Sequence, residues 1–495
     1  MPPSQNTTPE LYLSLLSGRH SDVSHLSTEQ CHPFPNDPDR LMDLLDALAA
    51  VCIRKEKGEV FFVSLAMDLK AVTLYVSSNK SVPATVISHL HKIQGQLKEL
   101  RKVVEPNPSI PADNETSPDP NKTQSRTDGE LELQKTIYEH SYSKLRRRFF
   151  KRAPAILAIY KTTVKSLQAN DKDAERLHLT HWALEHIQGL LQNDRPPCSL
   201  TDLIETIDGM SAVWRDCLNA AGSEDILTRW DNLIYADRIR KLSLRRLLKK
   251  LFTLHHHIRT ITRIAWSRRL SPFLEGQFDV VSVPAARGDI SITFSQQDVL
   301  PVIFPLGEQK ELLVCDELLK RLREKATNEG IELKNGTKLS MKTVVHAEST
   351  LLAYHLQHLD INPYHYFGGS KLSCHGCATL FSSFNLVAES FHHPQFFTKG
   401  CHNKIYLRWS CPSLLPLEQS KRLQPGTPSL DTEVRKKMIA ALSTELSAYV
   451  NELRAVVEGP SRPQLDSTTA SGDSRESAKE GRRLLKVRME AGMCE

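Results

Sequence analysis

The sequence predicts a mostly α-helical region followed by an α/β domain. Apolar residues recur at three- and four-residue spacing over much of residues 38–270, which is typical of amphipathic helices. Beyond Pro272, short runs of alternating polarity such as Phe278–Val283 and Ile290–Phe294 indicate strands. Helical segments lie between such runs, and this alternation is typical of an α/β domain.

Composition and charge exclude several classes of protein. The chain has 495 residues, of which 40% are hydrophobic, and its net charge of +6 is far below that of a protein that coats nucleic acid. It contains no apolar run of about 18 residues, so a transmembrane helix is not expected. Its first residues lack the basic and apolar segments of a secretory signal, and its ten cysteines are scattered. We therefore expect reduced thiols in an intracellular protein, cytoplasmic or nuclear and not secreted.

Segments rich in proline and polar residues divide the chain. They predict flexible or disordered stretches, because such stretches bury too little apolar surface to offset the loss of chain entropy. The expected order is a flexible N-terminus (1–37), a helical region (38–270) with a disordered linker at about 105–129, an α/β domain (275–415), an amphipathic helix (430–458) and a disordered tail (459–495).

One pair of cysteines is closely spaced. Cys374 and Cys377 are three positions apart, so at the start of a helix both sulfurs would face one side of its first turn and could hold one metal ion. The free N–H groups at a helix N-terminus would stabilise their thiolates. A CxxC pair alone is equally typical of a redox pair or of half a structural zinc site.

His346 and Glu348 add the features of a catalytic site. His346 follows a strand-like run and precedes an amphipathic helix, so we expect its ring to supply a third metal ligand above the sheet. Three protein ligands and an open fourth position are typical of catalytic zinc. Because two thiolates offset the charge of Zn²⁺, a bound water is acidified less than it would be by three imidazoles, and a carboxylate must take its proton. Glu348 is placed to do so and then to protonate the substrate ring and the leaving amine.

These residues carry a resemblance to a known family. His346-Ala347-Glu348 with Cys374-x-x-Cys377 resembles the signature of the zinc-dependent cytidine deaminase superfamily. The run Tyr366–Lys371, and the run Gly400–Lys404 followed by Tyr406 and Trp409, resemble more narrowly a largely uncharacterised fungal-type family. Its members are deaminase-like proteins with bacterial relatives and a long helical N-terminal region. The resemblance covers about residues 275–415.

The resemblance implies a fold and a set of roles. The fold is a cytidine deaminase-like three-layer α/β/α domain with a mixed sheet of about five strands, which include Tyr364–Phe367 and Lys404–Trp409. By position, the resemblance assigns His346, Cys374 and Cys377 as the zinc ligands. It assigns Glu348 as the catalytic proton shuttle. Ser373 stands where many members have proline, so the turn before the first thiolate is expected to be less rigid.

The predicted function is that of a zinc-dependent hydrolytic deaminase. Its substrate would carry an amino-bearing nucleobase of cytosine or adenine type, as a base, nucleoside, nucleotide or nucleic acid. Tyr366, Lys371 and His402 are predicted to contact the substrate, by stacking on a base or by meeting a phosphate or a substrate edge.

Two other hypotheses remain open. Cys401, His402 and Cys411 could complete a structural zinc site with the CxxC pair, and the protein would then be a non-catalytic zinc scaffold whose helical region binds a protein partner. Basic residues in Lys144–Arg152 and Arg238–Lys250 could instead contact nucleic-acid phosphates, although a solvated helix face explains them more simply.

Overall fold

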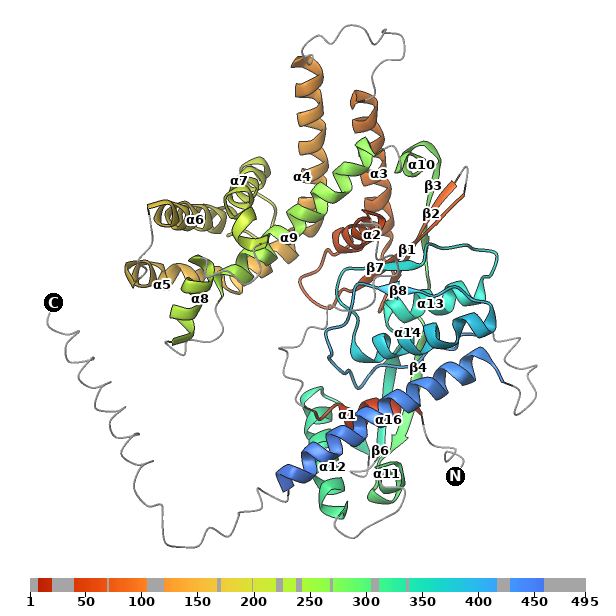
Figure 1. Cartoon of the computed structure of the whole chain (residues 1–495). Coiled ribbons are helices and arrows are strands. Elements are labelled where there is room, and N and C mark those ends of the chain that lie inside the picture. Colours follow the sequence, from red (N-terminus) through yellow and green to blue (C-terminus); the bar gives the residue numbers. More distant parts are fainter. Residues whose placement is uncertain are drawn as a thin grey trace, which may run out of the picture.

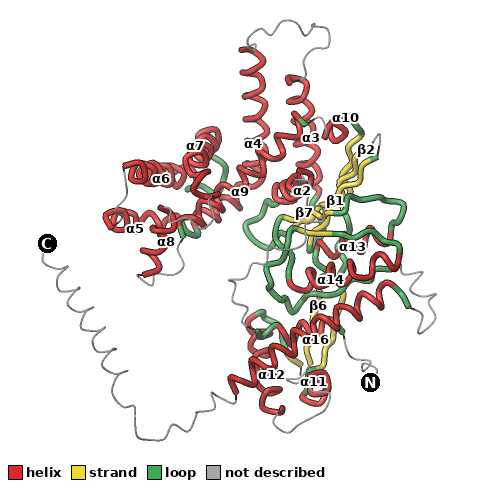
Figure 2. The backbone as a smooth tube through the Cα atoms, viewed as in Figure 1, coloured by secondary structure: helices red, strands yellow, loops and turns green. Residues whose placement is uncertain are grey.

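The molecule combines a central sheet with a long helical excursion (Figures 1 and 2). The computed structural model describes residues 8–19, 40–68, 71–104, 120–166, 171–197, 199–219, 226–236, 243–267, 270–303, 311–334, 338–415 and 428–457. Among these residues, no helix has the length and apolarity that crossing a membrane requires.

The central sheet has five strands in the order β3-β2-β1-β7-β8. Strand β1 runs antiparallel to both of its neighbours, whereas the β2–β3 and β7–β8 pairs are parallel. The predicted mixed sheet of about five strands is thus confirmed. The strands are β1 (Phe61–Met67), β2 (Ala71–Ser78), β3 (Gln277–Ser282), β7 (Tyr366–Gly369) and β8 (Phe397–Thr398).

Helices cover both faces of this sheet and make it the middle of three layers (Figure 1). Along β1, Phe61 and Val63 point into the core formed with α2 (Arg40–Val51), and Phe62 between them points into the opposite core. That opposite core contains α13 (Ala347–Gln357) and α14 (His375–Ala388), the helices that begin at the predicted motifs. The alternation of side chains along a strand therefore supplies apolar surface to both layers.

The helical region leaves the sheet after β2 and returns to it at β3. Its first two helices form a long hairpin, the next five gather into a bundle beside it, and the short last helix packs on the first helix and on the edge of the sheet (Figure 1). The helices are α3 (Ala84–Val104), α4 (Pro120–Phe150), α5 (Ala153–Ser166), α6 (Asp171–Leu190), α7 (Leu200–Asn219), α8 (Ile226–Ala236), α9 (Leu244–Thr262) and α10 (Ser271–Glu275).

A second, smaller sheet lies below the first in the view of Figure 1. Its three antiparallel strands have the order β4-β6-β5, and its last long strand leads into the site. The elements are β4 (Arg287–Thr293), α11 (Gln296–Ile303), α12 (Glu311–Asn328), β5 (Leu333–Lys334) and β6 (Lys338–Val344).

The two ends of the described chain pack together. The N-terminal α1 (Pro9–Leu16) lies along the C-terminal α16 (Leu430–Val457), and Leu15 of α1 is completely buried. The expectation of a flexible N-terminus is therefore wrong for residues 8–19. The helix predicted at 430–458 is present, because Val434, Met438 and Leu442 form a buried stripe.

Three other expectations differ from the structure. Residues 61–67 and 71–78 are strands within the region predicted to be helical, and 120–129 belong to α4 instead of a disordered linker. Residues 404–409 form a loop and not a strand, in which Trp409 alone makes an isolated parallel bridge, to Val344 of β6. The rest of the predicted linker (105–119), the remainder of the lead-in (1–7 and 20–37) and the tail (459–495) lie outside the described residues.

Candidate metal centre

His346 lies where β6 ends and α13 begins. It is the N-cap residue of α13, with an extended backbone (φ −69°, ψ 156°), and its side chain makes no capping hydrogen bond. The ring is therefore free to point away from the helix end. The first turn of α13 is held by β2, because the Ala347 N–H donates to Asn79 Oδ1 (2.9 Å) and Ser77 Oγ donates to the Ala347 carbonyl (2.7 Å).

Cys374 is the N-cap residue of α14, with an extended backbone like that of His346 (φ −80°, ψ 168°), and its side chain does cap the helix. Its sulfur accepts a hydrogen bond from the Cys377 N–H at 3.5 Å, so the first thiol faces the free N–H groups of the helix N-terminus. Burial raises the pKa of the Cys374 thiol, but hydrogen bonds from Cys377 and His346 and the charge of His346 outweigh burial and hold this pKa well below its usual range. The site thus favours a thiolate, which is the form that binds metal.

Ser373 fixes the turn before the first thiol. Its N–H donates to the Gly400 carbonyl (2.8 Å), its own carbonyl accepts from the His402 N–H (3.0 Å), and its hydroxyl lies 3.1 Å from Thr398 Oγ1. A proline in this place has no N–H to donate. These bonds tie the turn to the neighbouring loop, and the expectation that serine leaves it less rigid than a proline would stays a prediction.

The nitrogen and the two sulfurs form a compact triangle. His346 Nδ1 lies 3.3 Å from Cys374 Sγ and 3.5 Å from Cys377 Sγ, and the sulfurs are 3.5 Å apart. The sulfurs are too far apart for a disulfide. Tetrahedral zinc, with bonds of about 2.3 Å to sulfur and about 2.0 Å to nitrogen, separates sulfur from nitrogen by about 3.5 Å and sulfur from sulfur by about 3.8 Å. The three side chains therefore fit one zinc ion.

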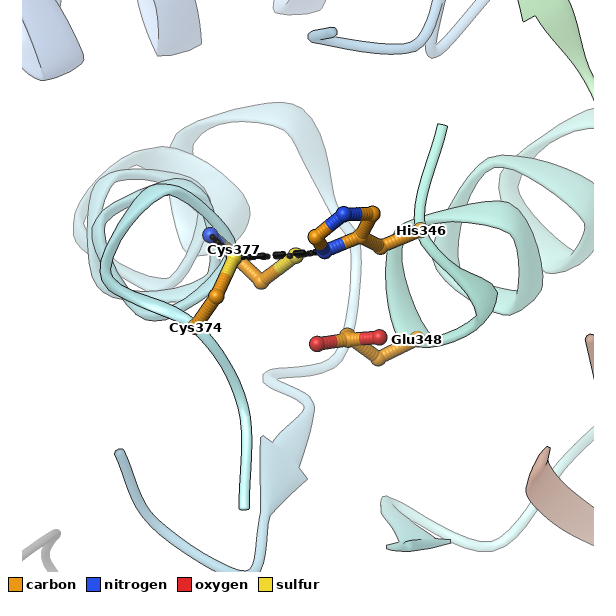
Figure 3. A group of neighbouring side chains, drawn as sticks. All are labelled: His346, Glu348, Cys374 and Cys377. Atoms are coloured by element: carbon orange, nitrogen blue, oxygen red, sulfur yellow. Dashed lines mark hydrogen bonds between the residues drawn. The ribbon is translucent and has the colours of Figure 1, made fainter. Parts of the chain in front are cut away.

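Glu348 points into the same space from the first turn of α13 (Figure 3). One ligand atom from each of His346, Glu348, Cys374 and Cys377 lies within 4.8 Å of the others, so the group can hold a metal ion. The Glu348 side chain is buried, and burial raises the pKa of its carboxyl above the ordinary range, with the Cys374 charge acting in the same direction. This carboxyl is suited to exchange a proton beside a metal.

Two further side chains donate to the second sulfur. Ser349 Oγ and Trp409 Nε1 each lie 3.2 Å from Cys377 Sγ. Such donors orient a thiolate and moderate its charge. The sequence pattern singled out neither residue for this role, because Trp409 lies 32 positions from Cys377 and only folding brings them together.

Glycine at 376 makes room for the tryptophan. A Cβ atom there would lie 2.9 Å from two atoms of the Trp409 ring and 3.0 Å from Leu13 Cδ1. Residues from α1 and from the loop after β8 thus close over the start of α14, and this packing places the indole N–H against Cys377.

The predicted substrate residues are dispersed. Tyr366 points to the face of the sheet opposite α13 and α14, where its hydroxyl lies 3.2 Å from Asp46 Oδ1 of α2, so its prediction as a substrate contact is wrong. Lys371 is exposed in the loop after β7 and neighbours Arg148 of the helical region. The structure brings neither residue to the metal centre.

His402 lies near the site in a loop. Its Nδ1 accepts a hydrogen bond from the Lys404 N–H (3.1 Å), and its ring centre is 6.0 Å from that of Tyr406. The Tyr406 ring in turn packs 5.6 Å from the His346 ring and is 40% exposed. Tyr406, which the sequence did not single out for this role, therefore lines the approach to the site together with His402.

The ligands of the alternative structural site do not converge on the CxxC pair. Cys401 Sγ accepts from the Asn403 N–H (3.2 Å), and Cys411 Sγ lies against Met438 Sδ at 4.0 Å. Burial raises the pKa of the Cys411 thiol to about 12, which disfavours a thiolate. Within the described part of the chain, the cluster able to hold a metal is the one that contains His346 and Glu348.

Comparison with known proteins matches part of the chain to a family model. Residues 345–413 match the model of the OTT_1508-like deaminase family (OTT_1508_deam), and this range contains both motif helices and β7. No curated protein and no solved structure matches the chain significantly. The family implies a substrate of nucleotide type. Together with the His346, Glu348, Cys374 and Cys377 cluster, the match identifies residues 345–413 as a deaminase-like domain of the cytidine deaminase-like superfamily.

Proposed function

We propose that the protein is a zinc-dependent hydrolytic deaminase that replaces the amino group of a cytosine- or adenine-type ring with oxygen. The observation that carries this proposal is the buried carboxyl of Glu348 beside three side chains that fit a zinc ion. A purely structural zinc site has four protein ligands and no need of a buried acid, whereas a catalytic site leaves a position for water.

The chain's own residues suit this chemistry. His346, Cys374 and Cys377 would hold the zinc ion, which, when bound, supplies a polarised water as the nucleophile. Glu348 would take one proton from that water as oxygen adds to the amino-bearing carbon, and would give it to the ring nitrogen. It would then take the proton of the newly added hydroxyl and give it to the amine, so that the C–N bond breaks as the C=O bond forms. Water is consumed and ammonia is released, so no oxidant or reductant is needed.

The approach to the site suits a planar substrate. The rings of Tyr406 and His402 lie beside His346. Aromatic rings of this kind can stack on any nucleobase, because every base has a flat face. The domain family supports a nucleotide-type substrate. A screen for ammonia release decides between cytosine and adenine compounds and between free and polymeric ones.

The test compares wild type, Glu348→Gln and Glu389→Gln for zinc content and for ammonia release from cytosine and adenine compounds. Gln keeps the shape of Glu but cannot accept the proton, so Glu348→Gln should keep its zinc and lose at least about a hundredfold in turnover. Glu389, which is exposed at the end of α14, should tolerate the same change. Equal turnover in wild type and Glu348→Gln would refute the role of Glu348.

The same measurements, with Cys374→Ser as a further variant, distinguish the non-catalytic scaffold. In a scaffold, Cys374→Ser would release zinc and unfold the domain, Glu348→Gln would be silent, and no ammonia would form from any compound in the screen.

A further inference from the structure

A hollow of about 400 Å³ lies in the helical region, between α6 and α7. A volume of about 10–15 Å³ is enough for one water molecule, so this hollow has room for a bulky side chain. Its wall is low in the middle, because Ala183 of α6 is buried and Gly209 of α7 has no side chain. A Cβ atom added at Gly209 would meet no atom within 4 Å, so the space above this glycine is open.

An exposed tryptophan of α6 stands at the edge of this hollow. Trp182 is 61% exposed, whereas Trp214 and Trp230 of the same helical region are fully buried. Leu179, one turn earlier on the same side of α6, is 47% exposed. The Trp182 ring stacks on His186, with ring centres 5.4 Å apart and 6° between the ring planes. This stack holds the indole in one orientation, so Trp182 has little side-chain freedom left to lose when a partner covers it.

The hollow offers few groups that could orient a small polar ligand. Apart from the indole, the described residues that line it have polar side chains only at Thr180, Glu205 and Thr206. The Thr180 hydroxyl accepts from Trp214 Nε1 (2.6 Å) and donates to a carbonyl of its own helix (2.7 Å). The Thr206 hydroxyl likewise donates to a carbonyl of α7 (2.6 Å). Because small-molecule sites combine apolar walls with several convergent polar groups, a hydrophobic side chain suits this hollow better.

The two helices have complementary surfaces. Leu179 and Trp182 form a ridge on α6, whereas α7 has the gap above Gly209. The polar side chains differ in the same way, since the exposed His186 of α6 can donate to a carboxylate and Glu205 of α7 is an exposed carboxylate beside the hollow. A surface that has both a projection and a matching gap can bind a second copy of itself about a two-fold axis, because each copy then supplies the projection that the other lacks.

We propose that the face formed by α6 and α7 binds a second copy of this chain, with Trp182 of each copy in the hollow of the other, over Gly209. Aromatic side chains that fill a pocket near the centre of an interface contribute most of its binding energy. In this arrangement His186 of each copy meets Glu205 of the other, at the rim of the contact. The face belongs to the helical region and contains no residue of the metal centre, so the proposal does not depend on deaminase activity.

Sedimentation velocity of the full-length zinc protein tests the proposal at chain concentrations between about 1 and 100 µM. Reducing conditions exclude disulfides between chains. Wild type should sediment as a dimer at the upper end of this range, and Trp182→Ala should raise the dissociation constant at least about thirtyfold, as the loss of a central aromatic contact does. Leu313→Ala is the matched control, because it removes an apolar side chain of α12 that is 64% exposed, and it should leave the dimer unchanged.

Gly209→Gln separates the contact from the fold. Its Cβ meets no atom within 4 Å, and glutamine is a better helix former than glycine, so the single chain should resist urea at least as well as wild type when both are monomeric. The longer side chain fills the gap that Trp182 needs, and the dimer should be lost. Gly95→Gln in α3 is equally open at its Cβ and should dimerise like wild type.

A mixture of the two variants tests whether the partner is a second copy. Trp182→Ala keeps the hollow and Gly209→Gln keeps the indole, so one intact contact can form only between unlike chains. The mixture should therefore dimerise at least about tenfold more tightly than either variant alone.

Three results would overturn the proposal: a wild type that stays monomeric, a Trp182→Ala or Gly209→Gln variant that dimerises like wild type, or a mixture that associates no better than its components. A monomeric wild type that binds an apolar dye, with binding lost in Gly209→Gln, would also overturn it and would assign the hollow to a small ligand.

Discussion

At the scale of single residues, the site depends on contacts that no spacing in the sequence reveals. The motif residues His346, Glu348, Cys374 and Cys377 converge as their spacing predicts, because each pair begins a helix that faces the other. Ser349 and Trp409 were missed, since their hydrogen bonds to Cys377 arise from tertiary packing. Tyr366 was misassigned because the face to which a strand residue points depends on a register that the sequence alone left open.

The indole N–H of Trp409 should strengthen metal binding. Trp409→Phe keeps an aromatic ring but removes the donor to Cys377 Sγ, and the loss of such an outer hydrogen bond typically weakens metal affinity about 10- to 100-fold. We expect a decrease of this size in competition with a chromogenic chelator. Trp182→Phe, at an exposed site on α6, is the control and should leave metal affinity unchanged. Unchanged affinity in Trp409→Phe would show that the hydrogen bond does not support the metal.

Gly376 should resist enlargement. In Gly376→Ala the new methyl group meets the buried Trp409 ring at 2.9 Å, so we expect a loss of about 1–3 kcal/mol in the free energy of unfolding. Gly95→Ala in α3 meets no atom within 4 Å and should be neutral or stabilising by up to about 1 kcal/mol. Urea denaturation of both variants checks the contrast, and equal stabilities would argue against tight packing over the start of α14.

At the scale of secondary-structure elements, the spacing of apolar residues predicts elements that bury one face and misses strands that bury both faces. Helix α16 (Leu430–Val457) has nearly the bounds of the amphipathic helix predicted at 430–458. Strands β1 and β2 were read as part of the helical region, because the first five residues of β1 are all buried and show no alternation of polarity. The strand expected at 404–409 is a loop, because its backbone contacts are single: Arg408 accepts a hydrogen bond from Val344 at the end of β6, where Trp409 forms an isolated bridge, and Lys404 accepts one from His375 of α14.

The contact between α3 and α4 should make the protein sensitive to acid. His89 of α3 stacks on His140 of α4 with ring centres 3.8 Å apart, and burial, with His140 and Lys92 nearby, lowers the pKa of His89 to about 3. The unfolded chain, with a histidine pKa near 6.5, then binds a proton that the folded chain does not, so stability falls as pH drops from about 6.5 towards 3. At pH 5.5 this single group lowers the free energy of unfolding by about 1.4 kcal/mol.

His89→Phe tests this account because it keeps a stacking ring that cannot be protonated. Between pH 7 and 5.5, the variant should lose about 1 kcal/mol less unfolding free energy than wild type in urea titrations. His91→Gln, an exposed position on the same helix, should show the same acid sensitivity as wild type. Parallel pH profiles for wild type and His89→Phe would contradict the assignment.

At the scale of the whole molecule, the deaminase-like fold is assembled from segments on both sides of the helical region. The family match begins at residue 345, yet α13 is anchored by Ser77 and Asn79, and β7 pairs with β1. The sequence placed the domain at 275–415 because the recognisable motifs lie there, whereas the strands that complete the sheet carry no motif. Topology of this kind follows from pairing between distant segments, which local patterns do not encode.

A fragment that begins at residue 275 should therefore fail to fold. It lacks β1 and β2, so β3 loses its partner β2, β7 loses β1 and keeps only β8, and the first turn of α13 loses both of its anchors. We expect no cooperative urea transition and no stoichiometric zinc in residues 275–495, whereas the full chain shows both. A fragment that unfolds cooperatively and retains zinc would show that the deaminase-like domain does not need the earlier strands.

X-ray absorption of the purified full-length zinc protein examines the metal's surroundings most directly. We predict two sulfur neighbours at about 2.3 Å and two nitrogen or oxygen neighbours at about 2.0–2.1 Å, which correspond to Cys374, Cys377, His346 and a solvent position. Cys374→Ser should reduce the sulfur count to one or abolish metal binding. A spectrum with three or four sulfur neighbours would instead indicate a closed structural site and contradict the assignment of a catalytic centre.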